Sequence, residues 1–137
     1  MRGIPVRIEC GPKDIENGQA VIVRRDTREK IVVSFEDLAQ KVQETLDTMQ
    51  REMLERARAH RDAHTYEARD YEEFRKTIEE KPGFVKAMWC GCQECEDKIK
   101  EDTQATSRCI PLEQEQISDN CVCFVNPATK MYYWGKA

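Results

Sequence analysis

Five cysteines lie in two tight groups near the end of the chain, and they constrain its fold more than any other feature. Cys90, Cys92 and Cys95 form a C-x-C-x2-C motif, and Cys121 and Cys123 form a C-x-C motif after 25 intervening residues. Structural Zn²⁺ takes four ligands in a tetrahedron, usually as two short-spaced pairs that the fold brings together. The spacing therefore predicts a closed, non-catalytic zinc site with one cysteine to spare. Spacing alone leaves open whether Cys90 or Cys92 is the spare one.

Disulfide bonds are a weaker explanation of these cysteines than metal binding. The chain has seven cysteines, an odd number, so they cannot all pair within it. The start of the chain, Met1–Pro5, lacks the apolar stretch of a secretory signal, which favours a reducing compartment and metal ligation. Two alternatives remain: buried free thiols, and a redox pair at Cys92 and Cys95. Cys10 and Cys109 fall on predicted strands and are expected to be core residues.

Composition and charge exclude several classes of protein. The longest apolar runs, such as Ile31–Val33, are far shorter than the roughly 20 residues of a membrane span. Residues 1–65 carry 12 basic and 12 acidic side chains, whereas residues 66–137 carry 10 and 14. A protein that holds nucleic acid by bulk electrostatics would have a basic excess. Any contact with nucleic acid must therefore come from a few placed residues.

Residues 1–65 are predicted to form an α/β domain with a mixed sheet and a long helix. Apolar runs or alternation predict strands over residues 4–10, 20–23 and 30–33, and the turn signals at 11–14 and 16–18 separate the first two. In the first strand, the buried face is expected to carry Ile4, Val6, Ile8 and Cys10. Ser34 and Asp37 have the spacing of a capping box, which predicts that Ser34 opens the helix. The apolar stripe of this helix fades after Leu54 into a charged stretch.

Residues 66–137 are predicted to form a small α+β domain, with the boundary near Thr65. A helix over residues 71–80 ends at Lys81-Pro82-Gly83, and a strand over residues 84–89 runs into the first cysteine group. A short helix over 95–100 and strands over 107–111 and 130–134 complete the domain. The chain has no glycine-rich phosphate loop, and no serine or cysteine nucleophile has a histidine partner nearby in sequence. The residues by themselves thus indicate a zinc-stabilised chain with no visible active site.

Two separate groups of motifs resemble one family. The segments Gly3–Asp14, Glu16–Gln19 and Val23–Asp26 are similar to the late part of the anticodon-binding domain of prolyl-tRNA synthetases. A second set of segments resembles the C-terminal zinc-binding domain of the eukaryote/archaeal-type enzymes. These segments are Trp89-Cys90-Gly91, Cys95-Glu96, Ile99-Lys100-Glu101, Ala105–Pro111 and Tyr133–Ala137. The resemblance covers nearly the whole chain, in order.

This resemblance implies a division of the chain and a ligand set. Residues 1–65 would be the C-terminal part of the anticodon-binding domain, and residues 66–137 the zinc-binding domain. The zinc ligands of the family match Cys90, Cys95, Cys121 and Cys123, which leaves Cys92 as the spare. The motifs of the class II catalytic domain have no counterpart here. The fragment alone is therefore expected to be inactive, and ATP would bind only in the full-length enzyme.

The resemblance also implies partners and RNA contacts. The full-length enzyme would attach proline to tRNA(Pro) in the cytoplasm as a homodimer, away from membranes, and this part would support the catalytic domain of the same enzyme. Proline anticodons share two guanines, whose edges offer N–H donors to carboxylates and an O6 acceptor to cations. The candidate RNA-binding residues are Glu9, Lys13, Asp14, Arg24 and Arg25. The alternative is a stand-alone zinc-stabilised protein-interaction module.

Overall fold

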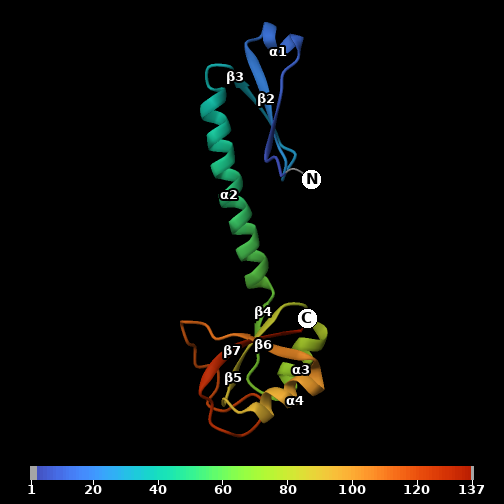
Figure 1. Cartoon of the computed structure of the whole chain (residues 1–137), viewed down its shortest axis with the longest axis vertical. Coiled ribbons are helices and arrows are strands. Elements are labelled where there is room, and N and C mark those ends of the chain that lie inside the picture. Colours follow the sequence, from blue (N-terminus) through green and yellow to red (C-terminus); the bar gives the residue numbers. More distant parts are fainter. Residues whose placement is uncertain (1–2, 137) are drawn as a thin grey trace. The chain divides into compact units, whose positions relative to one another are not determined.

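A computed structural model describes residues 3–136, which form two compact units that divide between Arg58 and Ala59 (Figure 1). The first unit combines a small sheet with a long helix, and the second is an α+β unit, so the predicted fold class is confirmed. The predicted domain limit near Thr65 stays a prediction. Within residues 3–136, no helix has both the length and the apolar composition needed to cross a membrane.

The first unit contains a three-stranded sheet in the order β1-β2-β3. Its strands are β1 (Val6–Glu9), β2 (Gln19–Arg24) and β3 (Lys30–Ser34), each close to a predicted strand. All three described strands pair antiparallel, whereas the sequence predicts a mixed sheet. The connections explain this difference, because short loops join antiparallel neighbours and a parallel pair needs a long crossover.

The turn predicted at residues 11–14 is a short helix, α1 (Pro12–Glu16). Pro12 occupies the first helical position, where its missing N–H costs nothing. The Asp14 carboxylate accepts a hydrogen bond of 2.9 Å from the Gly11 N–H. Residues typical of a turn therefore form one helical turn here. Pro12 has no N–H that needs a partner, and the Asp14 carboxylate is the acceptor for the Gly11 N–H.

The long helix, α2 (Leu38–Ala63), begins later than predicted. Ser34 ends β3 and does not open the helix, although its hydroxyl accepts a hydrogen bond of 3.2 Å from the Asp37 N–H. The Asp37 carboxylate bonds back to the hydroxyl of Ser34 at 2.8 Å and not to its backbone. The helix also continues past Leu54 to Ala63, because its charged residues and alanines are strong helix formers even without an apolar stripe.

The predicted buried face of the first strand is wrong. Ile8 pairs with Ile22 of β2, so the two side chains lie on one face of the sheet. Ile22 is fully buried, whereas Ile8 is 48% exposed and Cys10 is exposed. Ile8 is exposed because β1 is an edge strand of this sheet, whereas Ile22 lies on its central strand.

The second unit contains a four-stranded sheet in the order β4-β5-β7-β6. β4 pairs parallel with β5, and the other pairs are antiparallel. The sequence did not predict β4, which has only three residues. The elements of this unit are β4 (Thr65–Glu67), α3 (Tyr71–Glu80), β5 (Phe84–Trp89), α4 (Gln93–Thr103), β6 (Ala105–Cys109) and β7 (Lys130–Lys136).

The core of the second unit lies between its sheet and its two longer helices. α3 packs against β5 and α4 packs against β6 (Figure 1). Trp134, Phe74 and Ile99 are all fully buried in one apolar cluster. The Phe74 and Trp134 rings meet edge to face, with centroids 6.0 Å apart. This core supports the end of β5 and the start of α4, the two places where the first cysteine group begins and ends.

Candidate functional site

The first cysteine group wraps from the end of β5 into the first turn of α4. Cys90 follows β5, Cys92 is the N-cap residue of α4, and Cys95 lies in its first turn. The Cys90 sulfur is 3.3 Å from each of the Cys92 and Cys95 sulfurs, and the latter two are 3.0 Å apart. Gly91 has φ +89°, a left-handed conformation that lets the chain reverse between Cys90 and Cys92.

Backbone hydrogen bonds bring the second cysteine group to the first. The Val122 N–H donates to the Met88 carbonyl, and the Thr129 N–H donates to the Trp89 carbonyl, both at 2.8 Å. These bonds attach the loop of residues 119–129 to the end of β5. The Cys121 sulfur thereby lies 3.8 Å from the Cys95 sulfur.

The cluster has the chemistry and the spacing of a metal centre. A tetrahedron with metal–sulfur distances of about 2.3 Å places its sulfurs about 3.8 Å apart. The sulfurs of Cys90, Cys95 and Cys121 all lie within 4.8 Å of one another, and Cys95 and Cys121 are buried. All seven cysteines are free thiols. The cluster can therefore hold a metal ion.

The surroundings of the cluster shift the pKa values of its thiols in different directions. Burial raises the pKa of Cys95 well above the ordinary range of a thiol. Burial also acts to raise the pKa of Cys90, but hydrogen bonds from the Cys92 backbone N–H and from neighbouring thiols outweigh it and lower that pKa to about 7. Since the thiolate is the metal-binding form, the lowered pKa of Cys90 favours metal binding by its sulfur.

The five predicted RNA-binding residues divide between opposite ends of the β1–β2 hairpin. Glu9 ends β1 opposite Val21, and Lys13 and Asp14 follow it in α1. Arg24 lies opposite Val6, three residues along the ladder from the Glu9 pair, which corresponds to about 10 Å. Arg25 follows Arg24. The structure thus groups Glu9 with Lys13 and Asp14, and Arg24 with Arg25.

At the first end, both carboxylates already have partners. A hydrogen bond from Arg7 lowers the pKa of Glu9, and Lys30 lies 3.4 Å from the same carboxylate. Asp14 bonds the Gly11 N–H, which lowers its pKa and keeps it charged. Lys13 is exposed. Among the described residues, this end therefore offers the carboxylates of Glu9 and Asp14 as acceptors and the exposed Lys13 ammonium as a donor.

At the second end, Arg24 and Arg25 differ sharply in accessibility. The Arg24 guanidinium is buried and bonds Asp26 at 2.9 Å and 3.1 Å and Glu52 at 2.5 Å. Arg25 is exposed. A cleft of about 270 Å³ at this end is lined by Ile4, Val6, Arg7, Val23, Arg24, Arg25 and Arg28. Arg7 and Arg28 were not predicted from the sequence. The β1–β2 register places Arg7 opposite Val23, and the turn between β2 and β3 places Arg28 near Arg25.

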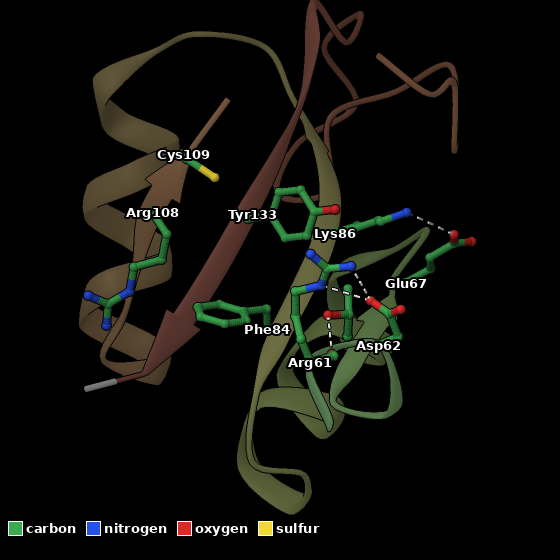
Figure 2. Close-up of a pocket in the computed structure, with 9 residues that line it drawn as sticks. Arg61, Asp62, Glu67, Phe84, Lys86, Arg108, Cys109 and Tyr133 are labelled. Carbon is green, nitrogen blue, oxygen red and sulfur yellow. Dashed lines mark hydrogen bonds and ion pairs between the residues drawn. The ribbon is translucent and has the colours of Figure 1, made fainter. Parts of the chain in front are cut away.

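A larger cavity, of about 660 Å³, opens in the second unit (Figure 2). Its charged side chains form ion pairs. Arg61 lies 2.7 Å from Asp62, and Lys86 lies 3.9 Å from Glu67 of the lining and 2.8 Å from Glu115 outside it. Cys109, predicted to be a core residue, is exposed and lines this cavity. The prediction was wrong because Cys109 is the last residue of β6, after a shift in its pairing with β7. The described lining residues include no histidine that could activate this thiol.

Comparisons with known proteins place both units. A family model described as "Prolyl-tRNA synthetase, C-terminal" matches residues 71–137, and one described as "Anticodon binding domain" matches residues 1–45. The chain belongs to the prolyl-tRNA synthetase family. The predicted family is thus confirmed, whereas its eukaryote/archaeal type stays a prediction.

Curated relatives match along the whole chain. The proline–tRNA ligases of Lachnospira eligens, Lachnoclostridium phytofermentans and Clostridium novyi are 67%, 65% and 57% identical to it over 137 residues. Each alignment covers 100% of this chain and 29% of the relative. The chain therefore spans less than a third of the length of the curated relatives it matches.

Proposed function

We propose that this chain is the C-terminal part of a proline–tRNA ligase, which joins proline to tRNA(Pro) at the expense of ATP. In this enzyme the first unit contributes to anticodon recognition, and the second is a zinc-stabilised domain that supports the catalytic domain. The observation that carries the proposal is the 67% identity to one such ligase along the entire chain. Neither unit needs a catalytic group for these roles.

The proposed metal is a structural Zn²⁺. Cys90, Cys95 and Cys121 provide three thiolates, and the resemblance to the family predicts Cys123 as the fourth. When bound, the ion supplies a cross-link between the end of β5, the start of α4 and the loop of residues 119–129. A site closed by four thiolates leaves no open position for catalysis.

The proposed RNA contacts use both ends of the β1–β2 hairpin. Glu9 accepts hydrogen bonds from the N–H groups of a guanine, and Lys13 donates to its O6. Arg25, beside Arg7 and Arg28, contacts phosphate, which positions the RNA without reading its sequence. Asp14 and Arg24 stay in the predicted set. To contact RNA, either side chain would have to give up a hydrogen bond that it makes in this structure.

The remaining roles belong to the rest of the enzyme. Relatives are more than three times as long as this chain, so the sites for ATP and proline fit in the part that precedes these domains. Pairing of that catalytic part would give the homodimer, and the setting is the cytoplasm. The competing function, a stand-alone zinc-stabilised interaction module, requires neither tRNA nor proline.

A chimera tests the proposed function directly. The last 29% of the Lachnospira eligens ligase is replaced by this chain, and charging of tRNA(Pro) with proline is measured. Charging close to that of the parent enzyme is expected. A folded, dimeric chimera that binds proline and ATP but does not charge tRNA would contradict the proposal and favour the interaction module.

The same chimera tests the proposed role of Glu9. Glu9→Ala should lower kcat/KM for charging by about 5- to 150-fold, the usual range for one base-edge contact. Glu16→Ala is the matched control, because Glu16 is an exposed glutamate of neighbouring α1, and it should change kcat/KM little. With tRNA already altered at the contacted guanine, the Glu9→Ala loss should largely disappear. Losses that simply multiply would show that Glu9 does not contact that base, and Asp14 would be tested next.

A further inference from the structure

An acidic residue lies inside the arginine-rich turn between β2 and β3. The run Arg24-Arg25-Asp26-Thr27-Arg28 places Asp26 between two of the arginines that surround the cleft at this end of the hairpin. A free carboxylate there would repel phosphate, so its position needs a reason. We propose that Asp26 is a positioning residue for RNA binding, which fixes the turn on α2 and so sets the directions of Arg25 and Arg28. This inference rests on the proposed contact of Arg25 with phosphate.

The Asp26 carboxylate is paired from two elements. The Arg24 guanidinium donates to it through two nitrogens, at 2.9 Å and 3.1 Å, which is the strong, fork-shaped form of an arginine–carboxylate pair. Arg56 of α2 donates to the same carboxylate at 2.9 Å. The Asp26 side chain is only 11% exposed. Hydrogen bonds from Arg24 and Arg56 hold the pKa of Asp26 well below its usual range, so the group stays charged and its charge is balanced within the fold.

Glu52 completes a ring of alternating charges. Its carboxylate lies 2.5 Å from the Arg24 guanidinium and 3.9 Å from that of Arg56. Glu52 and Arg56 lie one helical turn apart, so they share one face of α2. Arg24, Asp26, Glu52 and Arg56 thus form a charge ring, two from the hairpin and two from the helix, whose formal charges cancel. The turn cannot shift along α2 without breaking pairs in this ring.

The backbone of the turn needs such support. Arg28 has φ +64°, a left-handed conformation that residues other than glycine adopt at a cost. Such conformations persist where the surrounding contacts fix them. The Arg28 N–H donates to the Arg24 carbonyl at 3.2 Å, so the charge ring that holds Arg24 also supports Arg28. Arg25 and Arg28 are exposed and line the cleft, whereas Asp26 is not among its described lining residues.

The sign of a charge removal tests this role. Binding of tRNA(Pro) is measured with the chimera that carries this chain, at about 0.1 M salt. By electrostatics alone, loss of an acidic group should leave RNA binding unchanged or make it tighter. Asp26→Asn should instead weaken binding by about 5- to 25-fold, because one or two phosphate contacts are lost and each is worth about fivefold at this salt concentration. Asp47→Asn makes the same change at an exposed position of α2, and this matched control should not weaken binding.

Salt dependence distinguishes lost phosphate contacts from lost stability. The slope of log K against log salt counts phosphate contacts, at about 0.7 per contact for a single strand. Arg25→Gln should reduce its magnitude by about 0.7, and Asp26→Asn by about 0.7 to 1.4 although it removes no basic group. A variant with fewer folded molecules but intact contacts would keep the slope of the parent. In charging assays the loss should appear in the KM for tRNA, with kcat nearly unchanged.

Arg56 provides a second variant at an exposed position of the helix. Arg56→Gln opens the charge ring from α2 and should also weaken tRNA binding. Arg51→Gln removes the same charge from another exposed position of α2 and is its control. In the Asp26→Asn background, Arg56→Gln should add little, because both substitutions break the same ring. Equal effects of Arg56→Gln and Arg51→Gln would overturn the inference, whether or not Asp26→Asn folds.

The outcomes separate this inference from the proposed RNA contacts. If Arg25→Gln weakens binding and lowers the slope but Asp26→Asn does neither, the positioning role is wrong and the proposed contact of Arg25 stands. Tighter binding by Asp26→Asn would also overturn the inference, because Asp26 would then act only as a repelling charge. Losses that multiply for Asp26→Asn and Arg56→Gln would show that the two residues do not act through one ring. If Arg25→Gln changes neither value, the proposed contact fails and this inference fails with it.

Discussion

Ile99 and Leu112 allow the core of the second unit to be tested by two substitutions of the same size. Ile99 lies on α4, one helical turn after Cys95, and is fully buried in the apolar cluster. Leu112 follows β6 and its side chain is fully exposed. Changing either residue to alanine removes three carbon atoms, so burial is the main difference between the two variants.

The expected cost of Ile99→Ala follows from that burial. Three buried carbons at about 0.8 kcal/mol each give about 2.4 kcal/mol of lost transfer free energy. The cavity left behind adds up to about 1.5–2 kcal/mol, depending on how far the core relaxes. The better helix propensity of alanine returns about 0.4 kcal/mol. Ile99→Ala should therefore lower the free energy of unfolding by about 2–4 kcal/mol, and Leu112→Ala by no more than about 0.5 kcal/mol.

Urea unfolding followed by tryptophan fluorescence measures this difference. The chain has two tryptophans, Trp89 and Trp134, and both lie in the second unit, so the signal reports that unit alone. With a urea m value of about 1–1.5 kcal/mol per M, the Ile99→Ala midpoint should fall by about 1.3–4 M. All samples need the same Zn²⁺ and reductant concentrations, because bound metal adds to apparent stability. Similar midpoints for the two variants would refute the assignment of Ile99 to the core.

Three further predictions follow from the site and its surroundings. Removing Zn²⁺ with a chelator should lower the urea midpoint reported by Trp89 and Trp134, and an unchanged midpoint would contradict a structural metal. The purified chain should show no proline-dependent ATP–pyrophosphate exchange; detectable exchange would place an active site in these residues. The Tyr71 hydroxyl bonds the Asp102 carboxylate at 2.6 Å and holds the pKa of Asp102 below its usual value. A lowered folded pKa stabilises the fold above the unfolded value of about 3.9 and loses that effect as pH falls through the folded pKa. Tyr71→Phe should therefore destabilise the unit more at about pH 6 than at about pH 2, and a pH-independent loss would contradict this coupling.

Elements with strong local signals were predictable from the sequence. The helix over residues 71–80 has the predicted bounds, because Asp70 caps its first turn and Pro82 prevents its extension. The strand over residues 84–89 was also predicted with its observed bounds. The two cysteine groups were predicted to come together, and three of their sulfurs do. In each case the deciding residues lie within a few positions of one another.

The predictions that failed depended on which distant residues meet. Ile8 has the alternation of a buried strand face, but its strand is the edge of the sheet and leaves it exposed. The burial of Arg24 likewise depends on a distant residue, because Glu52 of α2 places its carboxylate beside the guanidinium. The predicted RNA contact of Arg24 stays a prediction. The three residues of β4 have no clear pattern of apolar residues, and they form a strand only because they pair with β5.

The sequence by itself determined the family, the positions of most elements and a cysteine cluster that can hold a metal ion, because spacing and residue type carry that information locally. Only the tertiary structure decided which thiols lie close to Cys95 and which of the polar side chains are exposed. Those outcomes depend on strand register and on loop docking, such as the bonds that attach residues 119–129 to the end of β5. These contacts join residues far apart in the chain, and their free energy depends on all the groups that the fold brings together at once.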